Sequence, residues 1–284
     1  MKVRPHRGTG VEILDVDLRA LDDERFAEIR RLFCEHGLVF FRDQELSERE
    51  HIAFAKRFGK VNINRFFDAH PEHPEVALVA KEPDQLLNIG GFWHADHSYD
   101  LEPALGSILV ARELPSRGGD TLFVSMYDAL EVLPESLRKR LFGMRGVHSS
   151  RHIFGSYSEK VRNLIDPKVG FGNAQASDQL GKVTHPAVIR HPLSGRDALY
   201  VNPGFTIGFE GWPIAAAVPL LGFIYAKVLA AGKVAKFRWR PGSIAMWDNR
   251  ATWHMARNDY RGQRRVMHRV TVEGCALSAA EAFH

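Results

Sequence analysis

Cysteine is scarce in this chain of 284 residues, which contains only Cys34 and Cys275. Two cysteines cannot form a disulfide framework, and their separation matches no spacing of a structural zinc site. The first residues also lack the apolar core segment that a secretory signal peptide requires. Because disulfide-rich frameworks belong to oxidising compartments, these absences favour a reducing compartment, and we expect a cytoplasmic protein.

Long apolar runs and a concentration of charge of one sign are also missing. The longest apolar stretch, 214–226, is interrupted by Pro219 and is too short to cross a bilayer, so no membrane contact is expected. The net charge is +4 and the pI is ≈ 9.1, which favours an anionic ligand. Basic residues are not clustered and do not alternate with aromatic ones, so nucleic acid is not expected as a partner.

What the chain does contain is typical of a globular protein, with 45% hydrophobic and 25% charged residues, and we expect one domain over residues 1–284. Apolar periodicity predicts helices over 22–35, 47–59, 126–142 and 214–231. Short apolar runs between glycine and proline turns predict strands over 38–41, 76–80, 107–111, 121–124, 187–190, 199–202, 235–240, 243–247 and 266–273. This order favours a mainly β fold with flanking helices, as an antiparallel sandwich or barrel.

Residues 150–185 differ from the rest of the chain. Glycine, serine, asparagine and lysine interleave there with isolated apolar residues, and no clear period is present. A segment of this kind inside a compact domain is either a functional lid or partly disordered, and we expect a lid or a mobile insertion.

Three residues suggest metal chemistry. His94 and Asp96 are two residues apart, so their side chains leave the same face of an extended segment, and His254 lies far downstream near a strand-like stretch. Two histidines and one carboxylate on one face of a metal are the ligand set of non-haem Fe(II) oxygenases. The pattern alone is weak, because a chain with 14 histidines can contain it by chance.

An arginine-dense strand after His254 strengthens this interpretation. Arg264, Arg265 and Arg269 follow within sixteen residues of that histidine. A dicarboxylate that chelates iron needs its far carboxylate held by a planar, bidentate cation, and the Thr121 hydroxyl is available to complete such a clamp. A solvated edge strand is the plainer interpretation of the same arginines.

Taken together, these motifs resemble the taurine dioxygenase family of Fe(II)- and 2-oxoglutarate-dependent enzymes, which includes the phenoxyalkanoate dioxygenases. The resemblance runs from about Gly10 to Glu273 and is nearer to the phenoxyalkanoate branch than to taurine dioxygenase itself. It implies a double-stranded β-helix, a cupin-like jelly roll, and the use of Fe(II), 2-oxoglutarate and O2. The motifs that carry it are Trp93-His-Ala-Asp96, Gly118-Gly-Asp-Thr121, His191-Pro-Leu-Ser-Gly195, Leu199-Tyr-Val-Asn-Pro-Gly-Phe205, Trp247-Asp-Asn-Arg250 and Arg264-Arg-Val-Met-His-Arg269.

The resemblance assigns roles to matching positions. His94, Asp96 and His254 would be the iron ligands, and Arg265 with Thr121 would bind the distal carboxylate of 2-oxoglutarate. Relatives that halogenate lack the aspartate of this motif, so the presence of Asp96 favours hydroxylation.

The substrate side follows the family less closely. Arg269 falls where the taurine enzyme places a cation against its sulfonate, but Asn64 and Phe67 replace a histidine and a tyrosine of that pocket. A neutral amide and a phenyl ring make a poor sulfonate site, so taurine is disfavoured and a larger, partly apolar acid is favoured. Arg151 is a further candidate partner for the acid, although a loop arginine is equally compatible with solvent. Phe67, Phe154 and Phe205 are candidate apolar wall residues, although phenylalanine is also a common core residue.

Several functions remain open at this point. The leading hypothesis is hydroxylation of a medium-sized organic acid, either an aliphatic acid or an N-substituted amino acid, with release of succinate and CO2. The alternatives are oxidative ether cleavage of an aryloxyalkanoate and oxidation of a sulfonate or sulfate ester. A metal-binding jelly roll without oxygenase activity is the competing class. The family resemblance also implies a homo-oligomer, either a dimer or a tetramer.

Overall fold

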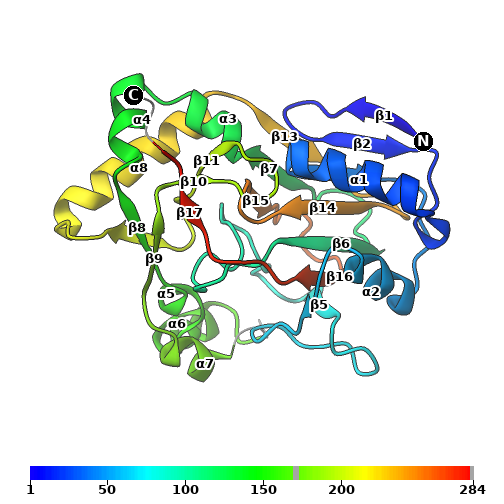
Figure 1. Cartoon of the computed structure of the whole chain (residues 1–284). Helices are drawn as coiled ribbons and strands as arrows, with labels where there is room; N and C mark the ends of the chain where they lie inside the picture. The colour runs from blue at the N-terminus through cyan, green and yellow to red at the C-terminus, as the bar shows by residue number, and fades with distance from the viewer. Residues whose placement is uncertain (169–172, 282–284) are drawn as a thin grey trace.

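An eight-stranded sheet is the largest feature of the computed structural model, which describes residues 1–168 and 173–281 (Figure 1). Neighbouring strands of this sheet pair antiparallel, except for the parallel pair β2 and β3. In spatial order the strands are β1 (Lys2–Pro5), β2 (Val11–Leu14), β3 (Leu38–Phe41), β14 (Ile244–Asp248), β6 (Gly106–Glu113), β16 (Arg265–Val272) and β4 (Val61–Asn62), with β5 (Ala77–Lys81) also paired to β16.

Three smaller antiparallel sheets complete the β structure of the described residues. The sheet that matters most for the site has the order β13 (Val234–Phe237), β7 (Thr121–Ser125) and β15 (Thr252–Ala256). The other two are β12 (Thr206–Phe209), β8 (Arg145–His148) and β9 (Val183–Pro186), and β11 (Asp197–Leu199), β10 (Val188–Arg190) and β17 (Ser278–Ala279). The prediction of a mainly β fold with flanking helices is confirmed.

The large sheet and the β13–β7–β15 sheet face each other as a sandwich. Alternation along β3 sends Leu38 and Phe40 into the core between the sheets, and Val39 and Phe41 into a second core on the opposite face. Phe40 of the large sheet stacks on Phe237 of β13 with ring centroids 4.2 Å apart, so the two layers are in direct contact.

Two helices cover the outer face of the large sheet. They are α1 (Asp23–His36) and α2 (Glu48–Lys56), drawn in blue in Figure 1. α1 begins at an Asp22 cap and ends at Gly37, whose φ of 66° is left-handed and therefore suits glycine. Ser47 and Glu50 form a capping box at the start of α2.

The remaining helices differ in part from prediction. The helix predicted over 126–142 is two helices, α3 (Met126–Glu131) and α4 (Glu135–Leu141), because Pro134 caps the second and cannot continue the first. The apolar helix α8 (Ile214–Ala230) forms as predicted. The strand predicted over 199–202 is shorter and earlier, as β11 ends at Leu199.

Residues 150–185 are more ordered than their composition suggests. They contain α5 (Arg151–Phe154), α6 (Ser156–Ile165), α7 (Ala174–Gln179) and most of β9, and the three helices gather below β8 and β9 in Figure 1. Residues 169–172 of the predicted lid lie outside the described residues, and the lid itself stays a prediction. Among the residues described, no helix is long and apolar enough to cross a membrane.

Candidate active site

The three predicted metal ligands meet in the interior of the sandwich. His94 and His254 are joined by a two-way backbone bridge, in which each amide donates to the other carbonyl at 3.1 and 2.9 Å. Asp96 follows two residues after His94, so its carboxylate reaches the same point. One nitrogen of each histidine and one carboxylate oxygen all lie within 4.8 Å of one another, and all three residues are buried.

A hydrogen bond on the far side of the His94 ring leaves the nitrogen required for metal binding free. His94 Nδ1 lies 2.7 Å from the Phe92 carbonyl oxygen and donates to it, which leaves Nε2 with its lone pair. Both Nε2 atoms face Asp96, with His94 Nε2 3.5 Å from Oδ1 and His254 Nε2 3.7 Å from Oδ2. Metal-binding histidines commonly donate a hydrogen bond from the other ring nitrogen, as His94 does here.

Electrostatics favour the ligand forms of these groups. Burial lowers the pKa of His254 well below its ordinary value, so the ring is neutral at neutral pH. Burial alone would raise the pKa of Asp96, but the Arg269 guanidinium holds it well below its usual range. Arg269 Nη1 donates to Asp96 Oδ2 at 3.0 Å. A neutral imidazole beside an ionised carboxylate is the donor set that Fe(II) requires.

A second part of the site is built around Arg265. Its guanidinium is buried, and Nε and Nη2 have no hydrogen-bond partner among the described residues. Buried guanidinium nitrogens normally have partners, so this pair fits the far carboxylate of a dicarboxylate. Thr121 lies in the same cavity, and its Oγ1 accepts a hydrogen bond from Trp239 Nε1 at 2.9 Å.

One cavity joins the metal triad to Arg265 and Thr121. A cavity lined by apolar side chains with a few convergent polar groups is the usual form of a small-molecule site. Its wall is mainly apolar and aromatic, and the side chains on that wall include Phe67, Ile89, Phe92, Ile153, Phe154 and Phe205. Arg269 is the second cation of the cavity, with its guanidinium carbon 4.6 Å from the centre of the Phe67 ring.

Two of the predicted substrate residues lie elsewhere. Asn64 is absent from the cavity wall, because its side-chain oxygen caps a turn and accepts from the amides of Phe66 and Phe67 at 2.8 and 3.2 Å. Arg151 begins α5 with its side chain 60% exposed and 3.7 Å from Asp178. Neither residue contacts the site in this structure, so their proposed contacts with the acid have no support in it.

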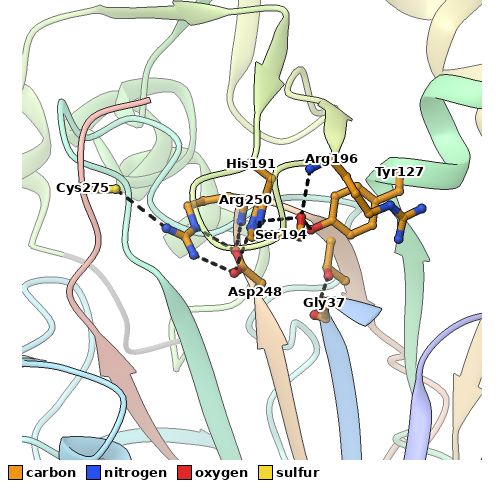
Figure 2. A network of polar contacts seen from close by, with 9 residues as sticks. Gly37, Tyr127, His191, Ser194, Arg196, Asp248, Arg250 and Cys275 are labelled. Carbon is orange, nitrogen blue, oxygen red and sulfur yellow. Dashed lines mark hydrogen bonds and ion pairs between the residues drawn. The ribbon is translucent and has the colours of Figure 1, made fainter. Parts of the chain in front are cut away.

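A buried ion pair fixes the turn that leads into β15 and therefore into His254. Figure 2 shows His191 and Arg250 converging on Asp248, at the end of β14. Arg250 Nε and Nη2 donate to the two carboxylate oxygens at 2.9 and 2.7 Å. His191 Nδ1 accepts from the amide of Ser194, so Nε2 carries the proton and donates to Asp248 at 3.0 Å. The motifs around His191 and Asp248 therefore stabilise the turn that positions His254.

The sequence analysis missed several residues of the site. Trp239 orients Thr121 and lies with its ring centre 5.8 Å from the Arg265 guanidinium carbon, but no sequence pattern marks it. Gly204 allows close approach to the metal centre, since a Cβ there would lie 2.6 Å from His94 Cβ. The glycine lies within the recognised motif ending at Phe205, which is the signal that could have identified it.

Comparisons with known proteins agree with this geometry. A family described as "Taurine catabolism dioxygenase TauD, TfdA family" matches residues 2–271. The 2,4-dichlorophenoxyacetate dioxygenase of Cupriavidus pinatubonensis is 33% identical over 95% of this chain and 95% of its own length. The sulfate ester dioxygenase of Pseudomonas putida is 31% identical over 96% and 90%. The crystal structure of a taurine dioxygenase from Burkholderia xenovorans superposes with a TM-score of 0.81 and 30% identity, covering 99% of this chain and 94% of that one.

Proposed function

Since this chain belongs to the TauD/TfdA family of Fe(II)- and 2-oxoglutarate-dependent dioxygenases, with the double-stranded β-helix fold of that family, we propose that it hydroxylates a medium-sized, partly apolar organic acid. The observation that supports the substrate class is the cavity, in which Arg269 lies beside the metal triad. Apart from the triad, Arg269, Arg265 and Thr121, the wall is mainly aromatic or aliphatic. An acid with an apolar body satisfies both features.

The proposed roles of the residues follow from their positions. His94, Asp96 and His254 hold Fe(II), and Arg265 with Thr121 binds the distal carboxylate of 2-oxoglutarate. When bound, iron and 2-oxoglutarate supply the oxidising power from O2, with succinate and CO2 as by-products. The chain itself keeps the His254 ring neutral, holds Asp96 ionised through Arg269, and surrounds the target C–H bond with apolar side chains that exclude water.

Oxidative cleavage of an aryloxyalkanoate is the second candidate. The aromatic wall favours it, because Phe154 and Phe205 have ring centroids 6.0 Å apart and can contact an aryl ring. Hydroxylation of the carbon that bears the ether oxygen would release a phenol and a carbonyl compound. Product analysis separates the two candidates: a stable alcohol supports the first and a phenol supports the second.

The ligand assignment is tested by His94→Ala. We expect this variant to lose stoichiometric binding of Fe(II) and all turnover, because a carboxylate and one imidazole remain. His73→Ala, which changes a histidine outside the cavity, is the matched control and should retain both. Full iron content in the His94→Ala protein would refute the assignment.

A further inference from the structure

The cavity wall includes one segment that belongs to neither side of the sandwich. This segment, residues 151–166, comprises α5, α6 and Asp166, and it is called here the wall segment. It contributes Ile153 and Phe154 to the cavity, and the Phe154 ring stacks on Phe66 at 4.4 Å. Its position therefore decides how much room the apolar part of a substrate has.

A short loop beside the metal centre forms another part of the wall. This cover loop, residues 86–90, places Ile89 and Gly90 in the cavity. Gly90 lies directly against His94, since a Cβ built on it would be 3.2 Å from Cε1 of that ring. Any shift of the cover loop would therefore change both the cavity and the surroundings of a metal ligand.

Hydrogen bonds tie the cover loop to the strand that carries His254. The Ala256 amide donates to the Gly90 carbonyl at 2.9 Å, and Asn88 Nδ2 donates to the Ala256 carbonyl at 3.0 Å. Asn258 Nδ2 donates to the Leu86 carbonyl at 2.8 Å. These contacts fix the loop to that strand, and the amides of Leu86 and Leu87 take no part in them.

Asp166 accepts from both of those amides. Its Oδ2 lies 2.6 Å from the Leu86 nitrogen and 2.9 Å from the Leu87 nitrogen, across eighty residues of chain. Asp166 is 2% exposed. Burial would raise its pKa, but the amides of Leu87 and Leu86 lower it below the ordinary value, so the carboxylate is ionised at neutral pH. A buried carboxylate with several amide donors is a strong anchor.

The other end of the wall segment is anchored to the site as well. His152 Nε2 lies 2.7 Å from the carbonyl oxygen of Gly204, the glycine that packs against His94. Two further contacts lie beside Asp166, from Lys168 Nζ to Asp84 and from Gln85 Nε2 to the Lys168 carbonyl. Both are at the solvent-exposed surface and contribute little.

We propose that Asp166 is a positioning residue that sets the specificity of the reaction: by joining the wall segment to the cover loop, it fixes the gap between Ile89 and the Ile153–Phe154 pair in which the apolar body of the acid lies. The inference rests on the proposed function for its substrate. The 2-oxoglutarate side of the cavity, at Arg265 and Thr121, has no part in this linkage.

The first test measures the linkage without any substrate. Amide hydrogen exchange is compared in the full-length, metal-loaded protein and in Asp166→Ala, Asp166→Asn and Asp84→Asn. We expect faster exchange at Leu86–Gly90 in Asp166→Ala, a smaller change in Asp166→Asn, which keeps one acceptor oxygen, and none in Asp84→Asn, which removes only the exposed ion pair. Unchanged exchange at Leu86–Gly90 in Asp166→Ala overturns the proposal.

The second test measures selectivity with (2,4-dichlorophenoxy)acetate and decanoate as probes. In Asp166→Ala we expect a rise of about tenfold in the KM of the probe that the unaltered enzyme uses with the higher kcat/KM. The kcat and the KM for 2-oxoglutarate should stay within about twofold of the unaltered enzyme. A merely structural role would lower kcat, and kcat/KM for both the acid and 2-oxoglutarate, in proportion to the active fraction. That result overturns the proposal. If the unaltered protein releases no succinate, the proposed function fails, while the exchange comparison still decides the linkage.

Discussion

At the scale of single residues, the buried guanidinium of Arg265 is the most informative group in the site. The sequence has two adjacent arginines in this strand, and the structure separates their roles. Arg264 is exposed and bonds to Glu82 and Glu113, whereas Arg265 faces the cavity with two nitrogens that lack a partner among the described residues. Alternation along β16 explains the difference, since successive side chains leave opposite faces.

This pair gives a matched test of the co-substrate site. Arg265→Ala should raise the KM for 2-oxoglutarate by about a hundredfold, because it removes a charge-assisted, bidentate contact worth about 2–3 kcal/mol. Bound iron should stay at one equivalent. Arg264→Ala removes the same charge one residue earlier and should leave the KM within about twofold. Equal effects of the two substitutions, measured by succinate release, would contradict the assignment.

Residue chemistry also shows what the sequence could and could not predict. His94, Asp96 and His254 could be predicted as a group because their ligand pattern, weak by itself, is accompanied by the arginine-dense strand and by the family resemblance. Trp239 was not, because its contact with Thr121 depends on the pairing of β13 with β7. Arg269 was predicted to face the substrate, and the structure adds its hydrogen bond to Asp96, a contact between strands that no spacing reveals.

At the scale of elements, the turn between β14 and β15 determines where His254 lies. Arg250 and His191 both donate to Asp248 (Figure 2), and all three side chains have almost no solvent contact. Burial would raise the pKa of Asp248, but Arg250 and His191 hold it well below its ordinary value. The network therefore keeps a carboxylate ionised in the core, where an unpaired charge would be very unfavourable.

Asp248→Asn should accordingly destabilise the protein strongly. The substitution keeps the shape of the side chain but leaves the Arg250 charge buried and unneutralised, which costs about 3–5 kcal/mol. Urea denaturation measures the loss. Glu35→Gln, which breaks the exposed pair with Arg31 on α1, is the control and should cost less than about 1 kcal/mol. Similar losses of unfolding free energy in the two variants would show that the Asp248 network does not stabilise the turn between β14 and β15.

Elements also mark the limits of prediction from sequence. Helices with clear caps were predicted most closely, because their end signals are local: α1 was predicted to within one residue at each end, and α2 to within one residue at its start and three at its end. The break at Pro134 was overlooked even though proline is a local signal. The helices within 150–185 were not predicted, because α6 buries no side chain and its stability depends on tertiary anchors such as Asp166.

At the scale of the whole molecule, buried neutral histidines make stability depend on pH. Burial lowers the pKa of His51 to about 3, below the ordinary value of 6.5, and its Nε2 is 3.1 Å from the Ile108 carbonyl oxygen. Between these two values the unfolded chain binds a proton that the folded protein does not. Stability is therefore lost as the pH falls below about 6.5.

The contribution of His51 can be isolated by substitution. Between pH 7.5 and 5.5, His51 should account for about 1.4 kcal/mol of the lost stability. In His51→Gln, which has no titrating ring, the change in unfolding free energy over this interval should be smaller by that amount. Urea denaturation at the two pH values gives the comparison. An identical pH dependence in the variant and the unaltered protein would show that His51 is not held neutral in the fold.

The fold class could be predicted from the sequence because the strands are short, apolar and separated by glycine and proline turns. The order of the strands in the sheets could be predicted only through the family resemblance. Local sequence signals do not reveal a pairing such as that of β14 with β3, which are more than two hundred residues apart. Cavity side chains such as Ile89 and Ile153 come from separate loops and helices. Their convergence on one cavity is a property of the folded chain alone.

The measurement that tests this account most directly is succinate release by the purified protein with Fe(II), ascorbate, 2-oxoglutarate and O2. It is made with and without a panel of acids: taurine, aryloxyalkanoates, alkyl sulfates, fatty acids and N-acyl amino acids. We predict succinate release that depends on a partly apolar acid and is weak with taurine. No succinate with any acid, together with failure of the iron-loaded protein to bind 2-oxoglutarate, would contradict the account.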